Sequence, residues 1–370
     1  MKNELPDWQY ILFAVLFLLA LGTVFVFSST PMLESGPRIR FNHLGSVILG
    51  VGLMLWLMRL DYRVLRKHAY VLGLVAIILL AAVLFVGVTL NGATRWFRIG
   101  PMSFQPSEVA KVASIIFFAD FFSRKQKRVK EFWNGFLPAV FYSGLVLALI
   151  MFEPDLGTTL LLGGVIFCML LVAGFRLMHI FPSIVVVAFA AVPFLLRYPH
   201  VTQRLGTFFS GEYDHQVTQG LIALGSGGVT GLGLGNGMQK LRYVPLAWSD
   251  FAFALVGEEA GFIGCFLILV AYAVIVYFGF RIAMRCEDMF GKLLASGITL
   301  LIGGQALINL MVVTGLFPNK GIPLPFISAG GSAMVLLLCA MGLLLSVGKE
   351  THVQQEPELV GGKLSEGSPA

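Results

Sequence analysis

The stretch Tyr243-Val-Pro-Leu-Ala-Trp-Ser-Asp250-Phe-Ala-Phe-Ala-Leu-Val-Gly-Glu258-Glu259-Ala-Gly-Phe262 begins as a polar loop and turns, at Asp250, into a strongly apolar helix. Asp250 therefore stands at the mouth of a membrane helix, and Glu258 lies roughly 12 Å further in. Carboxylates at these depths cost free energy unless they face protein or a wet cavity, which makes them functional candidates. Because Asp is also a good N-cap residue, helix capping is an equally supported interpretation of Asp250.

The composition places the whole chain in a membrane. Hydrophobic residues make up 57% of it and charged residues 12%, and the mean hydropathy is +0.84. These values exclude a soluble globular domain, and several apolar runs reach the roughly 20 residues that cross a bilayer. The net charge of +6 does not indicate a nucleic-acid partner, because the basic residues lie in short loops between spans. We therefore expect an all-α polytopic membrane protein.

The apolar runs predict ten transmembrane helices in one membrane domain over residues 1–348, followed by a disordered cytoplasmic tail over 349–370. The loops are short except for an outward loop over 197–249 between spans 7 and 8. Lys and Arg concentrate in the even-numbered loops, which predicts that both termini are cytoplasmic and that Asp250 faces outward. The expected spans are 9–28, 43–59, 69–89, 107–122, 135–152, 157–174, 178–196, 250–280, 293–316 and 331–348.

Other polar residues fall in the same outward loops. Glu108 and Lys111 are three positions apart at the start of a helix and are expected to be neighbours on one face. A local ion pair that lets both be buried is one interpretation, and it does not exclude a role in a site. Asp155 lies in an acidic Pro-Asp turn, and Ser328 ends a proline-rich turn whose N–H groups favour anions. The glycine-rich run 225–237 predicts a close approach of backbone to a ligand or to a neighbouring helix.

Together these loops predict an outward-facing site for an anionic substrate. Cationic side chains can hold a phosphate or pyrophosphate, and a desolvated carboxylate among them can serve as a general base. The cysteines and histidines show no metal-ligand spacing. The candidate binding residues are Arg95, Glu108, Lys111, Asp155, Arg204, Lys240, Lys320 and Ser328, with Asp250 as the candidate catalytic residue.

Over about residues 10–348 the chain resembles the SEDS family (shape, elongation, division and sporulation) of RodA/FtsW peptidoglycan glycosyltransferases. Lys320, within Pro-Asn-Lys-Gly, favours the FtsW-like division branch over the elongation branch. The motifs that carry the resemblance are Arg95-Trp, Gln105-Pro-Ser-Glu108-x-x-Lys111, Pro154-Asp155-Leu-Gly157-Thr, Gly225-Ser-Gly-Gly, Gln239-Lys240, Ser249-Asp250-Phe-x-Phe-Ala, Glu258-Glu259-x-Gly261 and Pro323-Leu-Pro-Phe-Ile-Ser328-x-Gly330-Gly331-Ser332.

The resemblance implies polymerisation of lipid II, an undecaprenyl-pyrophosphate disaccharide-pentapeptide, on the outer face of the bacterial cytoplasmic (inner) membrane. It implies that Asp250 is the general base that deprotonates the 4-hydroxyl of the acceptor sugar. A divalent cation, Mg²⁺ or Mn²⁺, and a class B penicillin-binding protein transpeptidase are implied in the same way, together with divisome or elongasome proteins. The family commonly has His-Thr before this aspartate, where this chain has Trp248-Ser249.

Two other classes of function fit the same residues. A transporter that flips lipid II without chemistry would also have ten spans, a lipid ligand and buried ions. A non-catalytic scaffold for division proteins is the third class. Glu258 and Glu259 lie deeper than Asp250, and we expect them to serve the structure rather than the chemistry.

Overall fold

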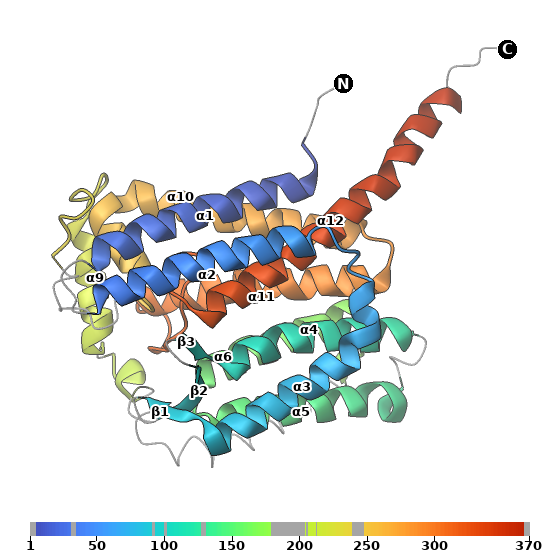
Figure 1. Cartoon of the computed structure of the whole chain (residues 1–370), viewed down its shortest axis with the longest axis horizontal. Helices are drawn as coiled ribbons and strands as arrows, with labels where there is room; N and C mark the ends of the chain where they lie inside the picture. The colour runs from blue at the N-terminus through green and yellow to red at the C-terminus, as the bar shows by residue number, and fades with distance from the viewer. Residues whose placement is uncertain are drawn as a thin grey trace.

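The structure is a computed structural model that describes residues 5–30, 35–90, 93–99, 102–126, 131–178, 204, 206–211, 213–238 and 248–365. Most of these residues lie in helices that run alongside one another (Figure 1). The π-helical turn η2 (Phe132–Phe136) leads into α5. The helices are α1 (Asp7–Ser29), α2 (Gly36–Leu57), α3 (Val64–Val86), α4 (Pro106–Arg124), α5 (Leu137–Phe152), α6 (Leu156–Val172), α9 (His215–Ser226), α10 (Ala252–Arg285), α11 (Met289–Val313) and α12 (Ser332–Ser365).

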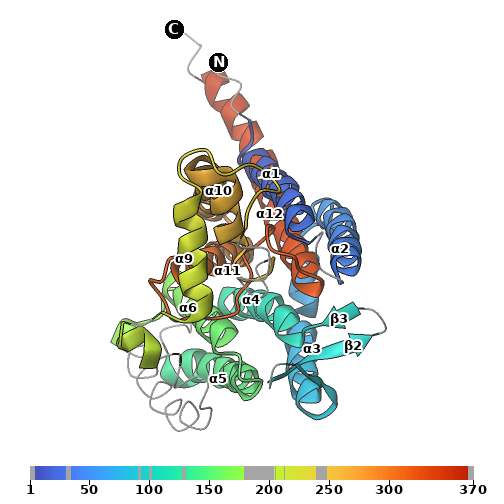
Figure 2. The same ribbon diagram turned by 90° about the vertical axis from the view of Figure 1, so that its left-hand side faces the viewer.

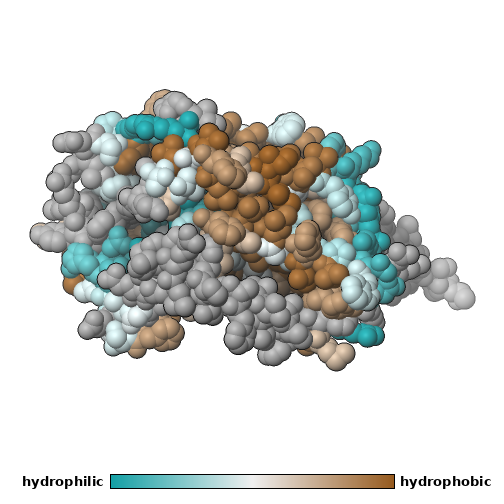
Figure 3. Space-filling view, turned by 90° about the horizontal axis from the view of Figure 1, so that it is seen from below, coloured by the Kyte–Doolittle hydropathy of each residue, from teal (hydrophilic) through white to brown (hydrophobic). Residues whose placement is uncertain are grey.

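The helices confirm a polytopic membrane fold. Among the described residues, seven helical segments are long and apolar enough to cross a bilayer, and α6 is a shorter apolar helix. Figure 3 shows a band of hydrophobic surface across the middle of one face, with hydrophilic residues towards its two ends. Each expected span except one coincides with a described helix. The exception, 178–196, lies outside the described residues apart from Met178.

Helices α4 and α11 form the centre of the bundle, as the view along the helices shows (Figure 2). Nearly every residue of α4 is buried, including its charged Glu108, Lys111 and Asp120. Small residues let the neighbouring helices approach closely, which is how helices associate where lipid removes the hydrophobic driving force. A Cβ added at Gly297 of α11 would stand 2.6 Å from the side chain of Ile115 in α4.

The fold is mainly helical, as expected, but the loop between α3 and α4 adds a small β-sheet that we did not predict. Residues between α3 and α4 form three short antiparallel strands, β1 (Val88–Leu90), β2 (Ala93–Ile99) and β3 (Met102–Phe104), in the order β1-β2-β3. Thr94, Trp96 and Ile99 are residue types that favour strands, so the local sequence supports the sheet. The run is too short to stand out beside the long apolar spans.

Two further elements differ from the sequence predictions. The segment 197–249, predicted as one long loop, contains α9, an amphipathic helix that packs against α10. Helix α12 continues past Lys349 as far as Ser365, within the tail that we expected to be disordered. The last span supplies a formed helix to extend, and polar residues add to it at little cost. In Figure 1 the start of α1 and the end of α12 lie at one end of the bundle, and α9 and the strands lie at the other.

The glycine-rich segment supports a break in α10. Gly261 has φ 64° and ψ −160°, a conformation that interrupts the helical hydrogen bonds. Backbone groups of 227–233 replace the lost bonds: Leu232 N–H donates to the Glu258 carbonyl at 3.0 Å, and Phe262 N–H donates to the Gly228 carbonyl at 2.9 Å. The predicted close approach of this segment to a neighbouring helix is confirmed.

Glu258 and Glu259 complete this junction. Met238 N–H donates to Glu258 Oε1 at 2.6 Å, and the Ser28 hydroxyl donates to Glu259 Oε2 at 2.6 Å. Both carboxylates are buried and hydrogen-bonded, so they bind the glycine-rich segment and α1 to α10, in agreement with their expected structural role.

Candidate active site

Asp250 lies in the turn immediately before α10, at the end of the bundle that carries the strands. The N-cap of α10 is Phe251, and no side chain caps the helix there. The capping interpretation of Asp250 is therefore wrong. Its carboxylate instead accepts a hydrogen bond from the Ser249 hydroxyl, at 2.8 Å to Oδ1.

The proline-rich loop before α12 holds the backbone around Asp250 in place. The Asn309 side chain donates to the carbonyls of Asp250 and Ile322 at 2.8 and 2.7 Å, which ties α11 to both segments. A Cβ added at Gly321 would stand 2.9 Å from Asp250 Oδ2, so the glycine makes room for the carboxylate. The loop is largely buried, as irregular backbone at membrane depth must be.

Ser328 also acts on this backbone. Its side chain is 2% exposed and donates to the Ser249 carbonyl, while its oxygen accepts from Leu324 N–H at 2.8 Å. Sequence analysis placed Ser328 among the substrate-binding residues. The structure gives it two backbone partners, which make it a residue that positions the 249–250 turn.

The surroundings of Asp250 favour a base. Burial raises the pKa of the Asp250 carboxyl above its usual range, and the nearby Asp155 carboxylate raises it further. The Ser249 hydrogen bond and the Arg204 guanidinium partly offset both effects. A carboxylate with a raised pKa accepts a proton more readily than an ordinary aspartate does.

Arg95 organises the acidic turn between α5 and α6. From strand β2 it donates Nε to the Glu153 carbonyl at 2.7 Å and also donates to the Pro154 carbonyl. Asp155 caps α6, accepting from Thr158 N–H at 3.0 Å and from the Thr158 hydroxyl at 3.0 Å. Glu153 is fully buried, and burial together with Asp155 raises its pKa to about 8, although Arg95 lowers it.

Lys320 and Arg204 bring positive charge to the same place. Lys320 is 8% exposed, and burial lowers its pKa to about 8, with Arg204 and Arg95 lowering it further and Asp155 raising it. Arg204 donates to the Asn319 carbonyl at 3.4 Å and is otherwise exposed. Lys320 forms no salt bridge with the described residues. The structure therefore gathers Arg95, Asp155, Arg204, Lys320 and Asp250 into one electrostatic neighbourhood.

Glu108 and Lys111 reach this neighbourhood through α11. They form the predicted buried ion pair at 2.9 Å, and Lys111 Nζ donates to Gln305 Oε1 at 3.0 Å. Gln305 in turn donates to the Pro323 carbonyl at 2.9 Å. A chain of polar contacts thus runs from the first two turns of α4 to the loop that carries Lys320 and Gly321.

Comparison with known proteins agrees with this geometry. A sequence model of the family FTSW_RODA_SPOVE, described as "Cell cycle protein", matches residues 9–353, which is nearly the whole chain. The chain belongs to this family. This FtsW/RodA/SpoVE-family protein is 39% identical over 311 residues to the probable peptidoglycan glycosyltransferase FtsW of Geobacter metallireducens, covering 81% of this chain and 82% of that one. It is 37% identical to stage V sporulation protein E of Bacillus subtilis, covering 94% and 98% of the two chains.

A solved structure shares the fold as well. It is described as "Structural coordination of polymerization and crosslinking by a peptidoglycan synthase complex", and one of its chains superposes with a TM-score of 0.78 at 29% identity. The match covers 94% of this chain and 98% of that one. The FtsW/RodA/SpoVE-family chain is thus a multi-pass membrane protein whose fold is known in a cell-wall synthase.

One predicted site residue cannot be located in the structure, and three residues that touch the site were not predicted from the sequence. Lys240 lies outside the described residues. Gln305, Asn309 and Glu153 were not among the candidates, although all three touch the site. Amides at Gln305 and Asn309 stand four positions apart within an apolar span, and polar residues in such a span are a functional signal in their own right.

Few of the described side chains could bind the expected divalent cation. Among the described residues no group of three or more His, Cys, Asp or Glu side chains is placed to hold a metal ion. Mg²⁺ and Mn²⁺ sites on phosphate substrates need only one or two carboxylates, with phosphate oxygens and water completing the shell. Glu153 fits that requirement, because its two buried oxygens accept no hydrogen bond from the described residues and Asp155 lies two positions away.

Proposed function

We propose that the chain is a peptidoglycan glycosyltransferase that polymerises lipid II, with Asp250 as general base. The observation that supports this most is the setting of Asp250: a carboxylate of raised pKa just before the start of α10, under the influence of the Arg204 guanidinium and against Gly321, the residue after Lys320. A sugar hydroxyl is far too weakly acidic to ionise at neutral pH, so its attack requires such a base. The relatives named peptidoglycan glycosyltransferase FtsW support the same activity.

In the proposed reaction the acceptor 4-hydroxyl transfers its proton to the Asp250 carboxylate while its oxygen attacks the anomeric carbon of the donor. The bond between that carbon and the pyrophosphate oxygen breaks, and undecaprenyl pyrophosphate leaves with the electron pair. Lys320 and Arg204 stabilise the developing charge, because preorganised cations in a desolvated site act strongly on a leaving anion. Among the described residues, Arg204 donates only to the Asn319 carbonyl and Lys320 forms no salt bridge, whereas Arg95 holds the 153–154 turn and Lys111 pairs with Glu108.

Arg95 and Lys111 take a different part in this proposal. Arg95 fixes the Glu153–Pro154 turn, and Lys111 is neutralised by Glu108. Both shape the walls of the site, and Arg95 also adds positive potential to it. A Mg²⁺ or Mn²⁺ ion, held by Glu153 and Asp155 together with the pyrophosphate, would add Lewis-acid stabilisation of the leaving group.

The proposal extends to location and partners. The site faces the outer side of the bacterial cytoplasmic membrane, and both termini are cytoplasmic, as the Lys and Arg bias predicts. A class B penicillin-binding protein would crosslink the product, which is supported by the likeness to a chain of a peptidoglycan synthase complex. The FtsW relatives and Lys320 favour the division branch, with divisome proteins rather than elongasome proteins as neighbours.

Purified protein in detergent, with its transpeptidase partner and lipid II, tests this function against the rival ones. A flippase has no bilayer to act across in detergent and makes no polymer, and neither does a scaffold. Glycan strands that appear with the wild-type chain and are missing with Asp250→Asn support the proposal. Absence of polymer with the wild-type chain, despite intact lipid II binding, would favour a flippase.

A further inference from the structure

A pocket opens beside the proposed active site, between the start of α9 and the end of α11. It is a half-open hollow at the protein surface rather than an enclosed cavity. Segments on both sides of it contribute, one from 204–217 and one from 315–319. Its walls combine charged, amide and aromatic side chains, and the residues used below are Arg204, Thr207, Phe208, Asp214, Phe317 and Asn319.

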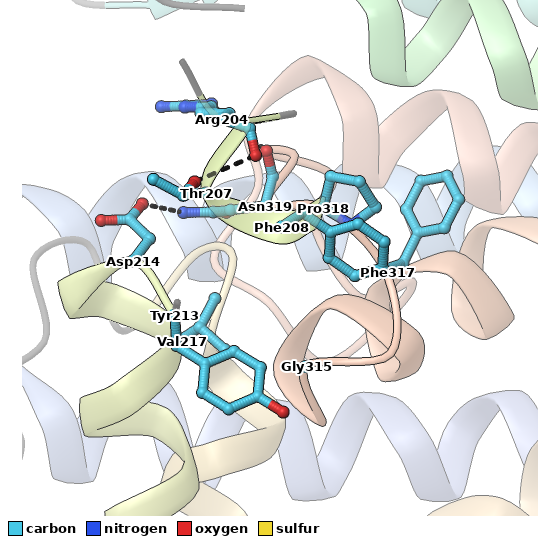
Figure 4. A pocket seen from close by; sticks show the side chains of 10 residues that line it. All are labelled: Arg204, Thr207, Phe208, Tyr213, Asp214, Val217, Gly315, Phe317, Pro318 and Asn319. Atoms are coloured by element: carbon cyan, nitrogen blue, oxygen red, sulfur yellow. Dashed lines mark hydrogen bonds between the residues drawn. The ribbon is translucent and has the colours of Figure 1, made fainter. Parts of the chain in front are cut away.

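The pocket is polar on one side and apolar on the other. Figure 4 shows the side chains of Arg204, Thr207, Asp214 and Asn319 gathered together, with the rings of Phe208, Phe317 and Pro318 opposite. Asn319 Nδ2 donates to Asp214 Oδ2 at 2.9 Å, which fixes the carboxylate within the polar side. Although Asp214 is the N-cap residue of α9, its side chain does not cap that helix. It is directed to the pocket wall instead.

One loop forms a wall of this pocket and of the active site. Asn319 lines the pocket, and Gly321, two residues on, lies against the Asp250 carboxylate. Arg204 also lines the pocket and acts electrostatically on both Asp250 and Lys320. The pocket and the Asp250 carboxylate are therefore joined by the 319–321 segment and by the charge of Arg204.

We propose that this pocket binds a saccharide ring of the acceptor strand, adjacent to the ring whose 4-hydroxyl reacts. The inference rests on the proposed function and adds a subsite to it. A pyranose has an apolar face of C–H groups and an edge of hydroxyl and amide groups. Aromatic rings suit the face, and a carboxylate with neighbouring amide and hydroxyl groups suits the edge.

The charges in the pocket distinguish this ligand from a pyrophosphate. Asp214 would repel a phosphate, whereas a carboxylate accepts hydrogen bonds from sugar hydroxyls. Asp214 forms no salt bridge with Arg204 in the described structure, so its carboxylate remains available to a polar, uncharged ligand. The stem peptide of lipid II is the remaining rival for the pocket, and the experiment below separates it.

The test is polymerisation of lipid II by the full chain with its transpeptidase partner, with KM and product length as readouts. Phe208→Ala removes an aromatic wall, and Asp214→Asn removes the charge while keeping the shape and the amide contact. Each is expected to raise KM for the acceptor by about three- to tenfold and to shorten the strands. Phe209→Ala is the matched control, because Phe209 is 80% exposed and does not line the pocket.

Two comparisons make the outcome decisive. The pocket variants should raise KM by the same factor for lipid II with a pentapeptide and for lipid II shortened to a dipeptide. Thermal melting must first show that the variants are folded. A loss confined to the pentapeptide substrate would assign the pocket to the peptide and overturn the proposal. Unchanged KM and strand length would also overturn it, while polymer from the wild-type chain and none from Asp250→Asn would leave the proposed function standing.

Discussion

The side-chain amide of Asn309 donates a hydrogen bond to the backbone carbonyl of Asp250, at 2.8 Å. The same nitrogen donates to the Ile322 carbonyl at 2.7 Å, so one side chain fixes the spacing between the proposed base and the loop opposite. Asn309 touches neither the carboxylate nor, in our proposal, the substrate. It acts as a positioning residue, and general-base catalysis is sensitive to the distances it sets.

Replacing Asn309 with leucine should lower kcat about 10- to 100-fold and leave KM nearly unchanged. Two buried carbonyls lose their donor, at a cost of about 1–3 kcal/mol each, and the Asp250 backbone is free to move. The measurement is steady-state polymerisation of lipid II. Leu307→Ala on the exposed face of α11, where Leu307 is 58% exposed, serves as the control. An Asn309→Leu enzyme with normal kcat would show that this contact does not position the base.

The pH dependence of polymerisation should have a limb set by Lys320. Because burial lowers the pKa of Lys320 to about 8, its positive charge is present below that pH and is lost as the pH rises through it. The rate should therefore fall above about pH 8. On the acid side, the raised pKa of Asp250 should place the loss of activity above the range of an ordinary aspartate.

Lys320→Arg should shift the alkaline limb to higher pH, since a guanidinium stays charged throughout this range. The profile of kcat/KM from pH 5 to pH 10 is the measurement. Glu153 also has a pKa of about 8, so Glu153→Gln is the necessary control and should retain the alkaline limb. If the limb vanished in Glu153→Gln and persisted in Lys320→Arg, Glu153 would be the titrating group.

Replacing only one partner of the Glu108–Lys111 ion pair should destabilise the fold more than replacing both partners. Lys111→Met leaves a buried carboxylate without its partner, a change of about 3–5 kcal/mol in comparable pairs, whereas Glu108→Gln with Lys111→Met leaves no net charge behind. We expect the single variant to melt at a clearly lower temperature than the double variant in detergent. Additive losses in the double-mutant cycle would mean that the two side chains do not interact.

The junction between α10 and the glycine-rich segment depends on Gly261. Its φ of 64° is strained for any residue with a Cβ, and an added Cβ would stand 2.3 Å from Gly231 N. Gly261→Ala should therefore lower the melting temperature and expose the 227–233 segment to proteolysis. Gly52→Ala, in α2 with no atom within 4 Å of the added Cβ, should be neutral or slightly stabilising. Equal stability of the two variants would contradict the role of the junction.

Sequence reasoning was sufficient where a local rule decides the structure. Hydropathy located the long helices of the described residues, the three-residue spacing predicted the Glu108–Lys111 pair, and glycine density predicted the close approach to α10. It failed where tertiary contacts decide. Nothing local to Arg95 shows that it binds the Glu153–Pro154 turn, and nothing local to Ser328 shows that it bonds to Ser249. The pocket at Asp214 and Asn319 joins segments about a hundred residues apart, which no sequence periodicity reveals.

The most direct test of the account is the single-turnover rate of lipid II polymerisation by Asp250→Asn, measured beside its affinity for lipid II. Asparagine keeps the shape and can still accept from Ser249, but it cannot take up the acceptor proton. We predict that the rate falls by at least about 100-fold, up to about 10,000-fold, while the affinity stays within about threefold of wild type. An Asp250→Asn chain that forms glycan at the wild-type rate would contradict the assignment of Asp250 as the base.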